Sequence, residues 1–114
     1  MYEYNAKVRK FVDGDTIDFT VDLGFNVFHS VRGRLINVDT PERGHPDWHR
    51  ANQECKNLVR QVATIFNEGH LDLEEWWVVI KTTKTGKYGR WLVEIIGVND
   101  KLAEIWPYYK TKKE

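Results

Sequence analysis

The chain has few of the residues that cross-link, kink or strongly charge a protein. It carries one cysteine, three prolines and no excess of either charge, with 17 Lys and Arg against 17 Asp and Glu. A single cysteine cannot form an intramolecular disulfide, which fits a reducing compartment. Zero net charge argues against a protein that coats nucleic acid by bulk charge, but it allows a local basic groove.

Long apolar runs are missing as well. No stretch is long enough to span a membrane, and the first residues, Met1–Tyr4, lack the apolar core of a signal peptide. We therefore expect a soluble protein without a membrane partner, and we favour the cytoplasm. With 41% hydrophobic and 13% aromatic residues, residues 1–114 are expected to fold as a single domain with a modest core.

Two periodicities alternate along the chain. Apolar and polar residues alternate from Ile17 to Leu23, which predicts a half-buried antiparallel strand. From Trp48 to Phe66 the apolar residues recur at steps of three and four, which predicts one helix of about five turns. Further strands are predicted over residues 7–12, 25–38, 76–82 and 91–98.

Finer signals refine these boundaries. Gly33 is a candidate bulge within the third strand. Asn99 or Asp100 is a candidate cap for a short helix over residues 102–106, which Pro107 would end. Residues 99–114 are thus expected to form a short C-terminal helix or tail.

The order of elements favours one fold class. Three strands, a helix and two more strands is the order of an OB-fold, an α+β fold with a five-stranded barrel. The long helix then lies between strands three and four. Periodicity alone leaves other small α+β arrangements open.

Two acidic clusters sit where strands are predicted to end. A D-G-D-T turn contains Asp15, and a D-T-P-E segment contains Asp39, Thr40 and Glu42. Two carboxylates at strand ends could converge on one cation, and Ca²⁺ takes oxygen ligands that include backbone carbonyls. The Thr40 carbonyl is therefore a candidate third ligand, and Glu42 could reach the ion through a water.

Two arginines could act on a phosphate beside such an ion. Arg34 lies on the strand before Asp39, and Arg90 ends a distant K-Y-G-R segment. A guanidinium presents a planar fork that suits two phosphate oxygens. Each cluster alone has a plainer interpretation, since Asp and Gly favour ordinary turns. The functional hypothesis depends on their occurring together in this order.

Together these motifs resemble the staphylococcal nuclease (thermonuclease) family. The matching segments are D-G-D-T at Asp13–Thr16, R-L-I-N-V-D-T-P-E at Arg34–Glu42 and K-Y-G-R at Lys87–Arg90. The resemblance covers roughly residues 7–98. It implies an OB-fold barrel that hydrolyses phosphodiester bonds of DNA and RNA at the 5′ P–O bond, with one Ca²⁺ ion and a preference for single-stranded or frayed substrate.

The resemblance also implies roles for individual residues around the ion. Asp15, Asp39 and the Thr40 carbonyl would be the Ca²⁺ ligands, and Asp13 would contact these ligands without binding the ion itself.

A second group of residues would act on the substrate. Glu42 would be the general base, while Arg34 and Arg90 would bind the phosphate and stabilise the transition state. Lys87 and Tyr88 would contact the phosphate end of the substrate.

Two alternatives stay open. Related domains on this fold bind nucleic acid or protein without cleaving it, so a catalytically weak binding module is the second hypothesis. A third is a subunit of a larger assembly. The acidic and arginine set favours the enzyme.

The C-terminal region departs from the family, which has two helices after its last strand. About sixteen residues follow Val98, too few for a full terminal helix, so we expect the remaining apolar residues to fold back over the barrel or to pair with a second copy as a weak homodimer. These residues are Leu102, Ile105, Trp106, Tyr108 and Tyr109.

Overall fold

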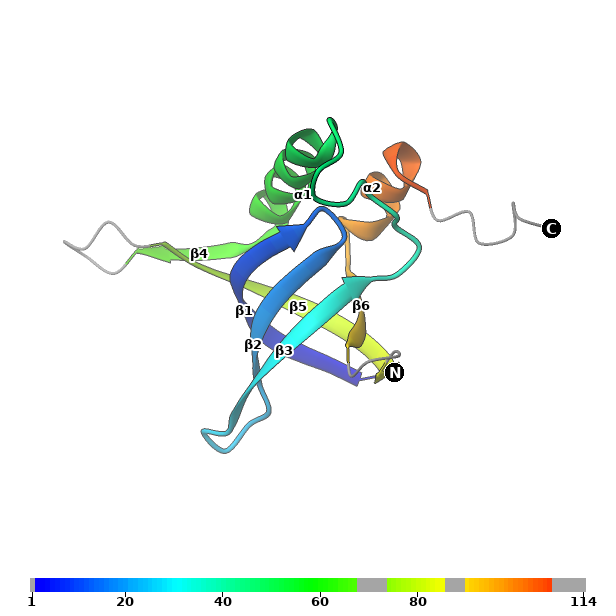
Figure 1. Ribbon diagram of the computed structural model, residues 1–114. Helices are drawn as coiled ribbons and strands as arrows, with labels where there is room; N and C mark the ends of the chain where they lie inside the picture. Colours follow the sequence, from blue (N-terminus) through cyan, green and yellow to red (C-terminus); the bar gives the residue numbers. More distant parts are fainter. Residues whose placement is uncertain (1, 68–73, 86–89, 108–114) are drawn as a thin grey trace.

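The computed structural model describes residues 2–67, 74–85 and 90–107, which form six strands and two helices (Figure 1). The strands are β1 (Tyr2–Asp13), β2 (Thr16–Asp22), β3 (Phe28–Leu35), β4 (Thr64–Asn67), β5 (Glu74–Thr85) and β6 (Trp91–Ile95). The helices are α1 (Trp48–Val62) and α2 (Asn99–Ile105).

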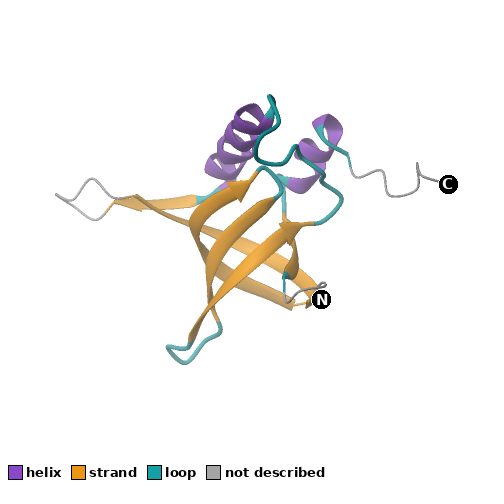
Figure 2. Ribbon diagram, in the orientation of Figure 1, coloured by secondary structure: helices purple, strands orange, loops and turns teal. Residues whose placement is uncertain are grey.

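Five of the strands form a closed ring. They are hydrogen-bonded in the order β1-β2-β3-β6-β5, and β5 pairs with β1 to complete the ring. The β3–β6 pair is parallel and the other pairs are antiparallel. Strand β4 lies outside the ring and pairs with the first residues of β5, on the edge of β5 opposite β1. This arrangement confirms the prediction of an α+β fold with a β-rich core. In the chain, α1 comes after β3 and before β5, which are the third and fourth strands of the ring, as predicted. Both helices lie at one end of the ring (Figure 2).

The core fills the ring and the space beneath the helices. Ile17, Phe19 and Val21 alternate along β2 and are buried, as the period of two requires. Helix α1 buries Ala51, Cys55 and Val59, which are spaced by four and share one helical face. Both helices cover the end of the ring where β1 turns into β2 (Figure 1). Neither of the described helices is long and apolar enough to cross a membrane.

The end of the long helix was predicted wrongly. Helix α1 ends at Val62, and Ala63 adopts extended dihedrals of φ −75° and ψ 145°. The following residues form β4, in which Ile65 pairs with Trp76 and Phe66 with Glu75. Their helical spacing was misleading because pairing with β5, distant in sequence, decides their conformation.

Gly33 is not a bulge. Its pairing with Ile17 continues the β2–β3 register without a shift. A Cβ at Gly33 would lie 2.8 Å from the Phe19 ring and 2.9 Å from a Val93 methyl, so the glycine allows close packing inside the ring. The register shifts lie instead in β1, between Val8 and Lys10 and between Phe11 and Asp13, and in β5, between Thr82 and Thr85.

Several other boundaries differ from prediction. Strand β5 covers Glu74–Thr85 where 76–82 was predicted, and β6 ends at Ile95 where 98 was predicted. Strand β1 begins at Tyr2 because its first half pairs with β5. Strand β3 occupies only the middle of the predicted range 25–38. Helix α2 has Val98 as its N-cap without a side-chain hydrogen bond, so neither Asn99 nor Asp100 caps it.

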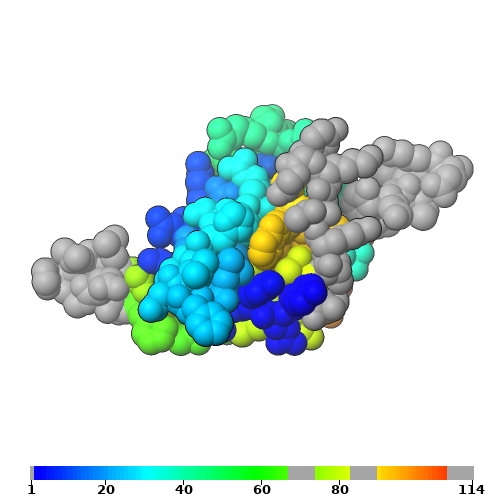
Figure 3. Space-filling model, turned by 90° about the horizontal axis from the view of Figure 1, so that it is seen from below, coloured from blue at the N-terminus to red at the C-terminus, as the bar shows by residue number. Residues whose placement is uncertain are grey.

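The turn between β2 and β3 projects from the ring at the end opposite the helices (Figure 1). Seen from below, the light-blue and cyan atoms of β2, β3 and this turn lie together on one face (Figure 3). Phe25 is fully exposed at φ 53°, and Asn26 follows at φ 61°. A bulky side chain in this left-handed region is uncommon.

The C-terminal segment folds back on its own chain. Leu102 is fully buried. The Trp106 indole N–H donates to Glu54 Oε1 at 2.7 Å, and the ring lies 4.8 Å from the Arg50 guanidinium. Ile105 is half exposed, and Tyr108 and Tyr109 lie outside the described residues. The fold-back hypothesis is thus confirmed for Leu102 and Trp106, and self-association stays a prediction.

Candidate functional site

Asp15 is the buried centre of the candidate site. Its Oδ1 accepts a hydrogen bond from the Thr16 hydroxyl at 2.9 Å, and its Oδ2 accepts one from the Thr40 backbone N–H at 3.1 Å. Its carbonyl accepts from the N–H of Leu35, at the end of β3, at 2.8 Å. The D-G-D-T turn is therefore bound directly to the D-T-P-E segment, as the convergence of the two motifs predicts.

The glycine of this turn allows a close approach. A Cβ at Gly14 would lie 2.9 Å from the Thr40 methyl and 3.0 Å from the carbonyl carbon and oxygen of Ala51. The backbone of α1 and the side chain of Thr40 occupy the space that any other side chain would need. Close packing, more than turn propensity, accounts for glycine at this position.

Arg34 joins the two acidic segments. Its guanidinium lies 3.0 Å from Asp15 Oδ2 and 3.8 Å from Asp39 Oδ1, and it donates to the Val38 carbonyl at 2.6 Å. The side chain of Asp15 is only 10% exposed, whereas that of Asp39 is 54% exposed. One end of this Asp15–Arg34–Asp39 cluster is thus shielded from water, which strengthens its electrostatic interactions, and the other end is open to solvent.

Two residues that were not predicted as site residues hold the D-T-P-E segment in place. The Asp39 N–H donates to the Trp106 carbonyl at 2.9 Å, and Val38 forms a β-bridge with Pro107.

A further residue, Asn99, is buried and was not predicted as a site residue. It accepts from the Ile95 N–H at 2.9 Å and donates to the carbonyls of Ile36 and Val93 at 2.9 and 3.1 Å. It thereby joins β6 and α2 to the segment that leads to Asp39. In the sequence, Asn99 directly follows the mostly apolar stretch 95–98, a position that predicts a helix cap.

The remaining predicted residues are placed less tightly. Glu42 is exposed, and its carbonyl accepts from the His45 N–H in a turn. Arg90 immediately precedes β6, whose first residue, Trp91, pairs with Gly33 of β3. Arg90 therefore lies beside the strand that carries Arg34. Lys87 and Tyr88 lie outside the described residues.

Asp13 contacts the helix side of the site. Its Oδ1 accepts the indole N–H of Trp48 at 2.6 Å. Since Trp48 is the first residue of α1, this bond fixes the start of the helix beside the D-G-D-T turn. Among the described residues, Asp13 thus contributes to the site by holding the start of α1 against the D-G-D-T turn.

The donor set suits a hard cation. Asp15, Asp39 and the Thr40 carbonyl offer oxygen atoms, the ligand type that Ca²⁺ takes. Among the described residues the Thr40 hydroxyl is buried without a hydrogen-bond partner. The guanidinium between the two carboxylates indicates that positive charge is favoured there. Among the described residues, no three or more His, Cys, Asp or Glu side chains form a group that could hold a metal ion.

The face of α1 behind the site is apolar. Cys55 is fully buried, as predicted for a core residue. Burial raises the pKa of the Cys55 thiol to about 12, and the negative charge of Asp15 adds to this shift. The thiol is therefore neutral and supplies no negative charge to the site.

Comparison with known proteins gives limited similarity. No protein-family profile matches the chain. The chain is similar to Protein ParB of Escherichia coli, with 33% identity over 70 residues that cover 61% of this chain. The match spans only 37% of the length of that protein.

Proposed function

We propose that this chain is a Ca²⁺-dependent nuclease that hydrolyses phosphodiester bonds of DNA or RNA, built on an OB-fold barrel. The observation that carries the proposal is the Asp15–Arg34–Asp39 cluster, whose members come from three different segments. The carboxylates of Asp15 and Asp39 both lie within 4 Å of the Arg34 guanidinium. The ring order β1-β2-β3-β6-β5 supports the finer assignment of the fold.

The two carboxylates and the Thr40 carbonyl would hold one Ca²⁺ ion. A bound ion would neutralise charge on the phosphoryl oxygens. Few protein ligands and an open side give weak affinity, so we expect a requirement for millimolar Ca²⁺.

The arginines and Glu42 would act on the substrate. Arg34 would exchange its contacts with the carboxylates for two oxygens of the scissile phosphate, and Arg90 would bind the same phosphate from its position directly before β6. Glu42 is exposed to solvent and would accept the proton of the attacking water. The water adds to phosphorus and the 5′ P–O bond breaks, leaving a 3′-phosphate and a 5′-hydroxyl.

A catalytically weak nucleic-acid-binding module is the second candidate. One observation favours it: the Arg34 guanidinium is already bound to Asp15 and to the Val38 carbonyl. Catalysis requires Arg34 to exchange these contacts for contacts with the phosphate, whereas nucleic acid can bind at other residues without that exchange.

Digestion of a single-stranded oligonucleotide with Ca²⁺, with Mg²⁺ and with chelator distinguishes the two candidates. We expect cleavage with Ca²⁺ to products bearing 5′-hydroxyls, and little turnover with Mg²⁺, which demands a tighter octahedron. Oligonucleotide binding without cleavage at any Ca²⁺ concentration would support the binding module. Full activity in excess chelator would contradict the proposal.

Substitutions test the assigned roles. Arg34→Ala and Arg90→Ala should each lower turnover by at least about a hundredfold, the scale for losing a charge contact made in the transition state. Glu42→Gln should do the same while leaving Ca²⁺ binding nearly unchanged. Arg60→Ala is the control, because Arg60 forms an exposed ion pair with Glu74 away from the site.

A further inference from the structure

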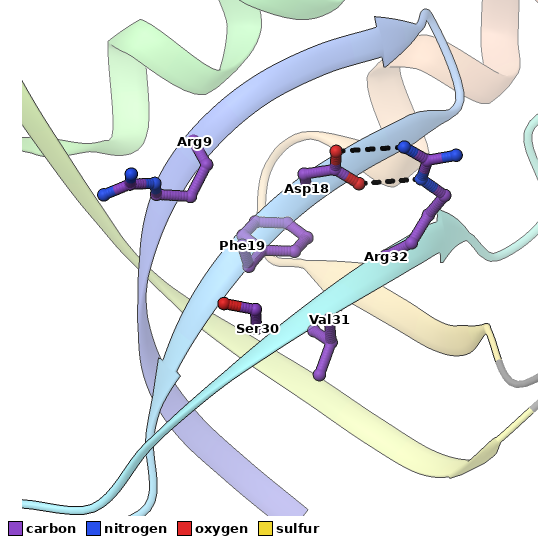
Figure 4. A pocket seen from close by; sticks show the side chains of 6 residues that line it. All are labelled: Arg9, Asp18, Phe19, Ser30, Val31 and Arg32. Atoms are coloured by element: carbon purple, nitrogen blue, oxygen red, sulfur yellow. Dashed lines mark hydrogen bonds and ion pairs between the residues drawn. The ribbon is translucent and has the colours of Figure 1, made fainter.

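An open hollow of about 370 Å³ lies on the outer surface of β1, β2 and β3 (Figure 4). The residues that line it are Arg9, Asp18, Phe19, Ser30, Val31 and Arg32. Phe19 and Val31 belong to the core, so the strands themselves form the floor. The polar rim consists of two arginines, one carboxylate and one hydroxyl, which leaves the hollow with an excess of positive charge.

The register of the strands connects this hollow to the Asp15–Arg34–Asp39 cluster. Arg34 pairs with Thr16, Arg32 with Asp18 and Ser30 with Thr20. Residues two apart on a strand lie on the same face, about 7 Å from each other. Arg32 therefore follows Arg34 on the same face of β3, and Ser30 follows Arg32.

Arg9 lines the hollow because β1 is irregular at this point. Val8 pairs with Phe19 and Lys10 with Asp18, so Arg9 is the extra residue of the register shift. An inserted residue of this kind re-aims its side chain relative to a regular strand. Arg9 is exposed, and among the described residues no hydrogen bond or ion pair involves its guanidinium.

Arg32 is fixed in orientation on the opposite side of the hollow. Its Nε and one terminal nitrogen contact the two oxygens of Asp18 at 2.8 and 3.1 Å, as the dashed lines in Figure 4 show. This bidentate pair holds a half-exposed guanidinium in place. Asp18 offsets one of the two positive charges, and the charge of Arg9 is left for a ligand.

We infer that this hollow is a second phosphate-binding subsite, which holds a neighbouring phosphate of the same single strand whose scissile phosphate is bound at Arg34. The inference rests on the proposed nuclease function and deepens it. Arg9 supplies the principal charge, and Arg32 and Ser30 supply hydrogen-bond donors. A substrate too short to reach the hollow gains nothing from it.

Kinetics on substrates of two lengths test the inference. For a twelve-nucleotide single strand, Arg9→Gln should raise KM by about tenfold, the effect of losing one hydrogen bond to a charged group. Turnover at saturation should be unchanged, and so should KM for a dinucleotide. Lys101→Gln is the control, because it removes the same charge from the exposed surface of α2.

The salt dependence of oligonucleotide binding in chelator gives an independent readout. Arg9→Gln should reduce the slope of log K against log salt by ~0.7, the value for one phosphate contact on a single strand. Arg9→Lys should restore the slope, since it keeps the charge.

The inference fails if Arg9→Gln and Lys101→Gln behave alike on a strand that the wild type cleaves. It fails together with the proposed function if the wild type neither binds nor cleaves the strand. Cleavage by the wild type with an unchanged KM in Arg9→Gln overturns the subsite alone.

Discussion

Gly14 shapes the candidate site through the side chain that it lacks. Gly14→Ala would place a methyl group about 3 Å from Thr40 and from the backbone of α1. Overpacking of this kind costs about 1–3 kcal/mol, so we expect a lower urea midpoint with an unchanged slope. The Asp15–Thr40 contact should also loosen, which would raise the Ca²⁺ concentration needed for activity.

Gly24→Asn provides the control for this substitution. Gly24 has open space where a Cβ would lie, so its substitution strains only the backbone at φ 86° and should leave the Ca²⁺ requirement unchanged. Equal unfolding midpoints for Gly14→Ala and the wild type would contradict the close-packing explanation.

Cys55 should be inert to thiol reagents in the native protein. It is buried and its thiol pKa is about 12, so the reactive thiolate is scarce at pH 8. We expect slow labelling by a disulfide reagent under native conditions and rapid labelling in denaturant. Rapid labelling of the folded protein would show that the helix face behind the site is open.

The same pKa shift predicts the direction of one pH effect. The thiol keeps its proton in the folded state up to about pH 12, whereas the ordinary pKa of a cysteine thiol is 9.0. Between these values the folded state binds more protons than the unfolded state, so this contribution to stability falls as the pH rises. Cys55→Ser lacks this titration, and its stability should fall less steeply over that window.

At the scale of elements, Asn99 joins α2 and β6 to the segment before Asp39. Asn99→Ala would remove the partner of the Ile95 N–H and of the Ile36 carbonyl, at a cost of about 2–4 kcal/mol for the buried groups, while the Val93 carbonyl keeps the Ile36 N–H. Thermal unfolding should show a clearly lowered Tm, and the Ca²⁺ requirement should rise. Asp100→Ala, at an exposed position of the same helix, should leave both nearly unchanged.

Elements with a local signal were predicted well from the sequence. The period of two gave β2 to within a residue at each end, and the period near 3.6 gave the start and the buried face of α1. The D-G-D-T and D-T-P-E motifs and Arg34 were also expected to lie together, and they do.

Elements set by distant pairing were not predicted. Strand β4 and the first half of β1 form because β5 pairs with both. The residues around each strand carry no sequence pattern that would predict these pairings. The roles of Asn99 and the Trp106 carbonyl depend on how the C-terminal segment packs, which periodicity does not encode.

At the scale of the whole molecule, the surface open to self-association differs from the one expected. Leu102 and Trp106 pack on their own chain, whereas Leu23, Phe25, Val27 and Phe28 are exposed around the β2–β3 turn. Exposed apolar patches of this kind often mark interfaces. We expect a weak dimer in a dilution series followed by light scattering, and we expect Phe25→Asn to weaken it. A monomer at all protein concentrations would contradict the predicted homodimer.

The Ca²⁺ dependence of turnover in the wild type and in Asp39→Asn tests the central claim most directly. Asp39 is half exposed, so its substitution should leave the fold intact, and Asp100→Asn serves as the control for charge. We predict that the wild type cleaves a single-stranded oligonucleotide only with Ca²⁺. Asp39→Asn should need at least about tenfold more Ca²⁺ for half-maximal turnover, since it loses one of two carboxylate ligands. Identical Ca²⁺ curves for the two proteins, or turnover that persists in excess chelator, would contradict a Ca²⁺-dependent nuclease centred on Asp15, Arg34 and Asp39.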